Sequence, residues 1–307
     1  MQKLLNISQF CNSMDLAPVI IFCYNRLNET QQTIQALKEN YLSEKSILFI
    51  FSDGPKKFKD HAKVKEVREF LQTVEGFKSI EIVKSKENNG LAQSIISGVS
   101  QVIEEYGKVI VLEDDLITSP NFLDFMNQAL DFHQDSEDIF SISGYTMDLP
   151  SLKDYPKDYY VGYRASSWGW GTWREQWEKV DWEVSNYSGF KWNLAEQLKF
   201  MRGGSDLPRM LSKQMNGKID SWAVRWCYDQ FKRDMYTVFP STSKVVSIGF
   251  GEDATHTKDT NRFDTILDQG EQRDFEFEAE TKIDKILAKE FRKKFSFKNR
   301  LLEKITL

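Results

Sequence analysis

Three consecutive carboxylates, Glu113-Asp114-Asp115, directly follow the apolar run Lys108–Leu112. Side chains of like charge repel one another and resist burial unless a cation joins them. Oxygen ligands suit a hard divalent ion such as Mg²⁺ or Mn²⁺, which keeps coordination positions open for the phosphates of a substrate. Taken alone, an acidic triplet is more typical of a solvated turn. Its position at the end of a predicted buried strand favours the cation site.

Two earlier apolar runs also end in polar residues. Pro18–Cys23 leads into Tyr24-Asn25-Arg26, and Ile47–Ser52 leads into Asp53-Gly54. Ligands of open α/β sheets bind at the carboxyl ends of the strands, so we expect Asp53 beside the acidic triplet, where its carboxylate can accept the imide N–H of a base. The sequence contains no GxxxxGK[ST] motif, and no GxGxxG motif follows the first run, so no standard phosphate-cradling loop competes.

The elements that must position these residues alternate regularly over the first 135 residues. Apolar runs at 18–23, 47–52, 80–83 and 108–112 are each followed by a helical pattern. This alternation predicts βαβ units and a mostly parallel sheet, which the near-continuous apolar runs place between two covering layers. Residues 151–226 hold all eight Trp, and we interpret them as the substrate-shaping half of the same domain.

Composition restricts the class of protein. The chain has 307 residues, of which 40% are hydrophobic and 28% charged, as in an ordinary globular α/β protein. A formal charge of −5 argues against a nucleic-acid binder. Three cysteines without a CxxC pair argue against a disulfide framework or structural zinc, and no apolar run approaches the roughly 20 residues that span a bilayer. We therefore expect a cytoplasmic protein, with attachment to the inner face of the membrane as the open alternative.

Taken together, the motifs resemble those of nucleotide-sugar glycosyltransferases with the GT-A fold. They are similar to bacterial family-2-like sugar transferases and to the N-acetylglucosaminyltransferase I family. The resemblance runs from Pro18 to Thr257, and its pieces are, in order, Tyr24-Asn25-Arg26, Ser52-Asp53-Gly54, Asn88-Asn89-Gly90-Leu91, Glu113-Asp114-Asp115-Leu116, Trp168–Trp173 and Gly249-Phe250-Gly251 running to His256. It implies a catalytic domain over residues 1–262, with a nucleotide-binding half at about 17–135 and an acceptor half at about 136–262.

The resemblance also implies roles for single residues. Asp115 would bind the Mn²⁺ or Mg²⁺ that bridges the donor diphosphate, while Glu113 and Asp114 would hold the ribose, the sugar or metal-bound water. Asp53 would read uracil. The other expected donor contacts are Tyr24, Arg26 near the base or the diphosphate, and Asn89 at the start of a helix, whose N-terminus favours anionic groups. His256 would contact the metal or the diphosphate, although a structural histidine is nearly as good an interpretation.

Inverting transfer needs a carboxylate that takes the proton of the acceptor hydroxyl. Asp220 matches the position of this base in the Golgi-type relatives, and Asp253 matches its position in many bacterial family-2 enzymes. We favour Asp220 and keep Asp253 as the rival. Trp168 or Trp170 is expected at the sugar, because aromatic rings cover the C–H faces of sugars and neighbouring glycines let the backbone approach a ligand.

The predicted function is therefore metal-dependent, inverting transfer of a hexose or N-acetylhexosamine. The donor would be a UDP-sugar, and the acceptor a glycan or lipid-linked glycan used in surface polysaccharide or glycolipid synthesis. Two alternatives stay open, a sugar nucleotidyltransferase and a catalytically silent protein that binds nucleotide-sugars or glycans. No nucleic-acid partner is expected.

The C-terminal part, residues 263–307, is predicted to be an acidic linker followed by a basic amphipathic helix. Residues 281–307 hold nine Lys or Arg against three Asp or Glu, and their apolar residues recur at roughly helical spacing. Such a helix either packs one stripe on its own domain or lies on an anionic membrane surface. The sequence leaves these two interpretations equally open.

Overall fold

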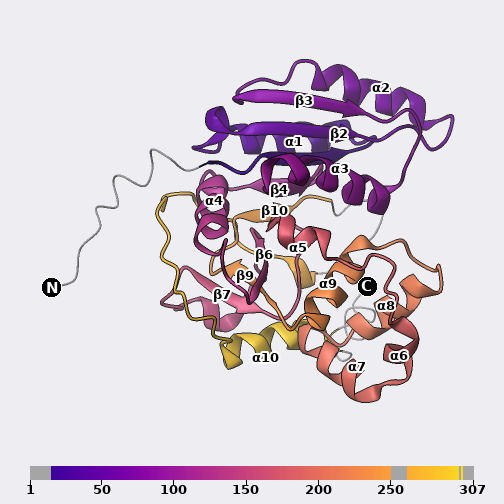
Figure 1. Ribbon diagram of the computed structural model, residues 1–307. Helices are drawn as coiled ribbons and strands as arrows, with labels where there is room; N and C mark the ends of the chain where they lie inside the picture. Colours follow the sequence, from indigo (N-terminus) through magenta and orange to yellow (C-terminus); the bar gives the residue numbers. More distant parts are fainter. Residues whose placement is uncertain (1–14, 250–260, 297–298, 300–307) are drawn as a thin grey trace.

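The computed structural model describes residues 15–249, 261–296 and 299. Its centre is an eight-stranded sheet with the order β3-β2-β1-β4-β8-β6-β9-β7. The first four strands are parallel to one another: β1 (Val19–Cys23), β2 (Ile47–Ser52), β3 (Ser79–Lys84) and β4 (Lys108–Glu113). The helices that connect them are α1 (Leu27–Lys38), α2 (Asp60–Leu71) and α3 (Leu91–Tyr106). This half lies at the top of Figure 1 and confirms the predicted βαβ units.

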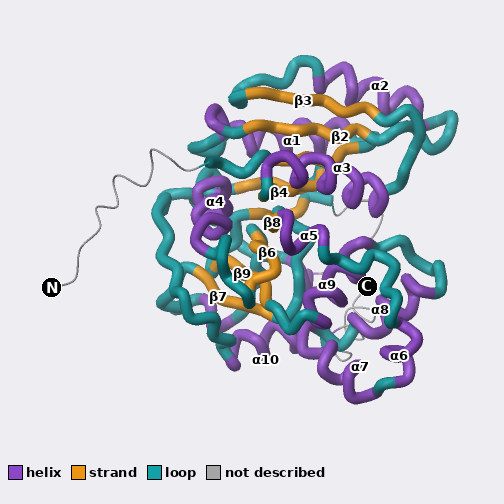
Figure 2. The backbone as a smooth tube through the Cα atoms, viewed as in Figure 1, coloured by secondary structure: helices purple, strands orange, loops and turns teal. Residues whose placement is uncertain are grey.

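The second half of the sheet is mixed. Strand β8 (Trp170–Trp173) runs antiparallel to β4, and β6 (Ile139–Ser143) runs antiparallel to β8 and therefore in the same direction as β4. Strand β9 (Tyr236–Pro240) is parallel to β6, and β7 (Tyr159–Gly162) closes the edge. A separate two-stranded ribbon joins β5 (Leu116–Thr118) to β10 (Val245–Ser247). Figure 2 shows the strands of both halves in orange.

Helices accompany the second half as well. They are α4 (Phe122–Phe132), α5 (Arg174–Glu178), α6 (Tyr187–Trp192), α7 (Leu194–Phe200), α8 (Leu207–Met215), α9 (Trp222–Lys232) and α10 (Lys285–Lys294). Short 3₁₀ turns cover Ser43–Lys45, Pro150–Leu152, Met201–Gly203 and Asn261–Phe263. Among the described residues, no helix is long and apolar enough to cross a membrane.

Two hydrophobic layers hold the sheet, one on each face. Successive side chains of a strand point to opposite faces, so Val19 and Ile21 join one layer while Ile20 and Phe22 join the other. Gly98 of α3 is needed for the second layer, because a Cβ there would lie 2.8 Å from the Phe22 ring. The sheet covered on both faces is thus confirmed, and its strand ends share one edge.

The described part of the C-terminal segment, residues 262–296, packs against the domain, which is one of the two interpretations that the sequence leaves open. Its acidic stretch is tied down by Asn121, which donates to the carbonyl of Gln272 at 2.7 Å, and by Gln128, which donates to that of Arg273 at 2.7 Å. In α10, which Figure 1 shows in yellow beside β7, Leu287 and Phe291 are buried. Within α10, Leu287 and Phe291 therefore face the domain, whereas Ile286 is exposed.

Candidate active site

A cavity of about 1250 Å³ lies at the carboxyl ends of β1, β2 and β4. Its lining brings together nine of the residues predicted from the sequence, namely Tyr24, Arg26, Asp53, Asn89, Glu113, Asp114, Asp115, Trp168 and Asp220. The other three predicted site residues are not in this lining. Trp170 lies in the core, and Asp253 and His256 fall outside the described residues.

Arg26 bridges two of the three acids. One guanidinium nitrogen pairs with Asp114, and the other donates to Asp115 Oδ2 at 3.0 Å. Asp114 also accepts the backbone N–H of Tyr24 at 3.3 Å, which ties the end of β4 to the end of β1. Strand pairing produces this arrangement, since Phe22 of β1 stands beside Glu113 of β4. The parallel register thus brings Tyr24 and Arg26 to the triplet, whereas Asp53, expected beside it, is separated from it by β1 because β2 lies one strand farther along the sheet.

Glu113, unlike Asp114 and Asp115, has no ion pair with Arg26 among the described residues. Among the described residues, none makes a hydrogen bond to its carboxylate, while burial and the charges of Asp115 and Asp114 raise its pKa to about 8. Burial also raises the pKa of Asp114 to about 6, against the attraction of Arg26. Three carboxylates against one guanidinium leave the ionised cluster two negative charges in excess. A divalent cation would neutralise that excess and hold all three acids in their ionised form.

The described residues contain no group of three or more His, Cys, Asp and Glu side chains arranged to hold a metal ion. An ion of the Mg²⁺ type is commonly bound through one or two carboxylates and the phosphates of a substrate. Asp115 and Glu113 are the residues of the triplet that could ligate it. The cluster thus fits a cation that is held jointly with the donor diphosphate.

Asp53 makes four hydrogen bonds of its own. Its Oδ1 accepts the backbone N–H groups of Gly54 at 2.8 Å and Asn89 at 2.9 Å. Its Oδ2 accepts the Asn88 side-chain amide at 2.9 Å and the N–H of Gly90 at 3.1 Å. An ionised carboxylate offers about four acceptor sites. In this structure Asp53 therefore fixes the loop that begins α3, and the Asn88 side chain is one of its partners.

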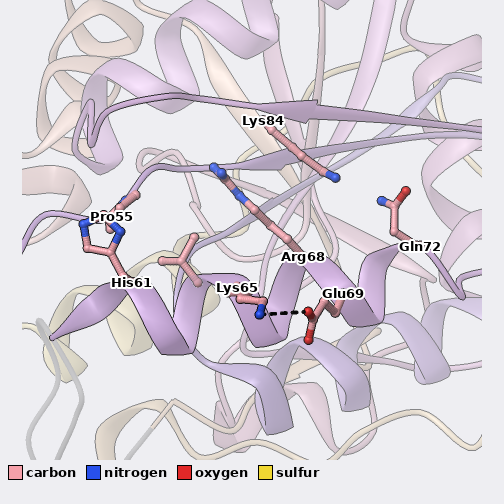
Figure 3. A pocket seen from close by; sticks show the side chains of 8 residues that line it. Pro55, His61, Lys65, Arg68, Glu69, Gln72 and Lys84 are labelled. Carbon is pink, nitrogen blue, oxygen red and sulfur yellow. Dashed lines mark ion pairs between the residues drawn. The ribbon is translucent and has the colours of Figure 1, made fainter. Parts of the chain in front are cut away.

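Arg68 is a positioning residue that the sequence did not reveal. It reaches from α2 toward the strands and lines a separate cavity of about 370 Å³, as Figure 3 shows. Its guanidinium donates to the carbonyls of Ser52 at 3.0 Å, Asp53 at 3.1 Å and Ser85 at 2.7 Å. Arg68 thereby holds together the ends of β2 and β3 and the backbone of Asp53. Only tertiary structure identifies this role, because an Arg in an amphipathic helix carries no local signal.

Asp220 lies beside the start of α3. Its Oδ2 is 3.9 Å from the position that a Cβ would take at Gly90, and its side chain is 68% exposed. A guanidinium nitrogen of Arg225 lies 3.8 Å from its Oδ1. The next residue, Ser221, caps α9 by accepting the N–H of Val224 at 3.4 Å. Asp220 is thus an accessible carboxylate held at a helix entry and facing the candidate donor site.

The two tryptophans expected at the sugar lie in different places. Trp168 is half-buried and lines the cavity. Trp170 is 1% exposed and packs in the core on Trp177, Trp222 and Trp226, with ring centroids 5.1–5.5 Å apart. This corrects the expectation for Trp170: the first residue of β8 turns into the hydrophobic layer, so only Trp168 stands where a ligand in the cavity could contact it.

Gly249 passes over the acid triplet. A Cβ at Gly249 would lie 2.1 Å from Asp115 Oδ2, and the preceding Ile248 donates its N–H to the Asp115 carbonyl at 2.8 Å. A larger residue at position 249 would therefore displace the Asp115 side chain. The chain that follows β10 is thus brought to the candidate cation ligand immediately before the segment that holds Asp253 and His256.

Comparison with known proteins agrees with this geometry. The model of the family described as "Glycosyl transferase family 2" matches residues 19–194, which is more than half of the chain. No curated protein matches the sequence. The eight-stranded mixed sheet flanked by helices, together with the family match, is the GT-A fold. The resemblance to the N-acetylglucosaminyltransferase I family stays a prediction.

Solved structures of similar shape are distant in sequence. A structure of S. aureus TarS, residues 1–349, has a TM-score of 0.43 and 8% identity, covering 76% of this chain and 61% of its own. An active-site mutant of LgtC has a TM-score of 0.37 and 10% identity, covering 69% and 70%. A mannosyltransferase from Pyrobaculum calidifontis, in complex with GDP-Man and Mn²⁺, has a TM-score of 0.37 and 12% identity, covering 57% and 52%. This chain thus spans about half the length of that mannosyltransferase.

Proposed function

Because this chain belongs to glycosyl transferase family 2, we propose that it transfers a hexose or N-acetylhexosamine from a UDP-sugar to a hydroxyl of a glycan or lipid-linked glycan, with inversion. The observation that carries the proposal is the acid triplet at the end of β4. It shares one cavity with the strand-tip residues of β1 and β2 and with an accessible carboxylate, Asp220. Surface polysaccharide or glycolipid synthesis is the process that this reaction would serve.

The donor side of the cavity is built from β1, β2 and α3. Tyr24, Asn89 and Arg26 line it, and so do Gly90 and Leu91 at the N-terminus of α3, an end of a helix that favours an anionic diphosphate. Asp53 contributes by holding the loop that carries Asn89. A base can reach Asp53 itself only by replacing one of its four present donors, so uracil recognition at Asp53 includes an exchange of hydrogen bonds.

In the proposed reaction, one group of residues in the cavity takes the proton of the acceptor and another holds the diphosphate of the donor. As the acceptor oxygen bonds to the anomeric carbon, Asp220 takes the hydroxyl proton, and the bond between that carbon and the diphosphate oxygen breaks. When bound at Asp115 and Glu113, Mn²⁺ or Mg²⁺ would offset the charge that develops on the leaving nucleotide. Arg26, now shared between Asp114 and Asp115, can turn one of its donors to the diphosphate. His256 and Asp253 remain proposed as a further metal contact and as the rival base.

The cation role is tested at Asp115. We expect Asp115→Asn to abolish transfer while leaving the circular dichroism spectrum and melting temperature near those of the parent chain. Calorimetry with UDP and Mn²⁺ should show weakened joint binding. The exposed Asp154, which does not line the cavity, supplies the matched control Asp154→Asn. Normal turnover by Asp115→Asn would contradict the metal role.

The two candidate bases are separated by paired variants. Asp220→Asn is expected to lower kcat by roughly 100-fold or more while UDP affinity stays unchanged, because a general base acts only in the transition state. Asp253→Asn is expected to retain most of its activity. The reverse result would move the base to Asp253. A screen of UDP-, GDP- and dTDP-sugars then tests the uracil preference.

A further inference from the structure

A continuous series of aromatic rings follows the cavity away from the acid triplet. Neighbouring ring centroids are 4.6 Å apart for Tyr145–Trp168, 5.4 Å for Trp168–Phe263, 6.1 Å for Phe263–Phe295 and 5.4 Å for Phe291–Phe295. All five rings line the same cavity as Glu113–Asp115. Phe263, Phe291 and Phe295 come from the C-terminal segment, which lies beyond the residues matched by the family.

Sheet order places these rings opposite the donor side. Strands β1 and β2, whose ends carry Tyr24 and Asp53, lie on one side of β4. Strands β8 and β6 lie on the other side; Trp168 shortly precedes β8, and Tyr145 follows β6. Because the acid triplet ends the strand between them, a donor on the β1 side leaves the aromatic side for the second substrate.

Trp168 and Phe263 are the two rings that a ligand can reach. Both are half-buried, whereas Tyr145, Phe291 and Phe295 are less than 9% exposed and form the support beneath them. We call Trp168 and Phe263 the aromatic platform. Their planes are inclined by 62°, so together they make a corner and not a flat surface.

The platform is fixed on both sides. The Tyr145 hydroxyl donates to the Phe263 carbonyl at 2.9 Å, and the guanidinium of Arg164 lies 3.9 Å from the centre of the Phe295 ring. Arg164 is itself held by two hydrogen bonds to Asp206, at 3.0 and 3.1 Å. Interactions that fix the supporting rings reduce the entropy lost when a ligand binds.

We propose that the aromatic platform binds a pyranose ring of the acceptor glycan, and that the C-terminal segment thereby builds the acceptor subsite. This inference rests on the proposed function. Aromatic faces cover the apolar C–H faces of sugars, while Asp206 and Arg164 in the same lining offer partners for hydroxyl groups. A lipid chain fits less well, because most of the apolar lining is already buried under the platform.

Saturation-transfer NMR tests the subsite with methyl glycosides of glucose, galactose, mannose and N-acetylglucosamine. Each is measured with and without UDP and Mn²⁺. We expect saturation of ring C–H protons for at least one glycoside, a roughly three- to tenfold loss of affinity in Phe263→Ala, and retention in Phe263→Tyr, which keeps the ring. Ile266→Ala is the matched control, since Ile266 is 77% exposed in the same segment and does not line the cavity.

The outcomes separate this subsite from the proposed function. Calorimetry with UDP and Mn²⁺ and an assay for hydrolysis of the donor by water test the donor side alone. If the parent chain neither binds UDP nor hydrolyses the donor, the proposed function is contradicted. The glycoside spectra decide the subsite independently of that result. Farnesyl phosphate, measured in the same way, is the probe for a lipid chain. Four results would overturn the subsite: no ligand saturates, only farnesyl phosphate saturates, Phe263→Ala saturates with the glycosides as the parent does, or Phe263→Ala loses UDP affinity equally.

Discussion

At the scale of single residues, the acid triplet contains two environments. Asp114 and Asp115 share the guanidinium of Arg26, while Glu113 is left with burial and two like charges. The arrangement stores unfavourable electrostatic energy in the ligand-free protein. Part of that energy is released when a cation binds, so affinity for the cation and stability without it are linked.

This linkage predicts how the metal-free protein responds to pH. The pKa of Glu113 is about 8 in the folded chain against a reference value of 4.5, so the folded state binds the extra proton between these values. Glu113 therefore contributes stability that is lost as pH rises from about 5 to about 8. Burial lowers the pKa of His133 to about 4, and this contributes in the opposite direction below about pH 6.5, so the net fall is expected between about pH 6.5 and 8. Glu113→Gln should weaken this fall and melt above the parent chain at about pH 8. The exposed Glu104→Gln is the control in thermal melts, and a parent melting temperature that rises over this range would contradict the prediction.

Asp53 supplies a second prediction at this scale. In Asp53→Asn, the amide nitrogen meets two N–H donors in place of an acceptor, so about two of the four hydrogen bonds to the loop at the start of α3 are lost. We expect the free energy of unfolding to drop by about 1–3 kcal/mol and KM for the donor to rise. Urea denaturation and donor titration measure the two effects. A higher KM without any loss of stability would instead indicate that Asp53 acts only on the base.

At the scale of elements, the apolar side chains of α10 differ in what they contact. Leu287 and Phe291 are buried against the domain, while Ile286 on the other face is 62% exposed. The sequence predicts the helix and its stripe but cannot identify the surface that covers it. Burial against a domain and insertion into lipid require the same periodicity.

The two uses of α10 differ in the consequences of mutation. Phe291→Ala should cost about 3–5 kcal/mol of stability, as for a large core residue, whereas Ile286→Ala should change stability by less than about 0.5 kcal/mol. Chemical denaturation of both variants measures this difference. Sedimentation with anionic vesicles provides the opposing test, because a membrane-surface helix would lose binding in Ile286→Ala.

At the scale of the whole molecule, the N-terminal half, which consists of parallel βαβ units, could be predicted from the sequence. The β1, β2 and β4 strands, and the gathering of Arg26, Asp53 and the acid triplet around one cavity, follow from parallel βαβ units, whose strand ends share an edge. The placement of Trp170 in the core could not be predicted from the sequence. Alternate residues of a short strand face opposite layers, and the spacing of the eight tryptophans does not show which of them face the core. The Asp53 loop contacts and the return of residues 262–296 depend on packing between distant parts of the chain.

That return makes residue 262 a poor place to divide the protein. Phe275 packs on Phe125 at 5.2 Å between ring centroids, and Phe291 packs on Phe239 at 5.6 Å. A chain that ends at residue 262 uncovers these core rings, so we expect it to melt well below the full chain or to aggregate. Light scattering and thermal melts of the two forms measure this, and equal melting temperatures would show that the segment is dispensable.

The placement of Phe263, Phe291 and Phe295 also sets an order of events during biosynthesis. The ribosome makes the nucleotide-facing strands before these three phenylalanines. Until they leave the exit tunnel, Phe239 of β9 lacks its Phe291 partner, and the wall proposed to receive the second sugar is missing. The nascent polypeptide can therefore assemble one side of its cleft early, but it completes the other side only after residue 295 has been made.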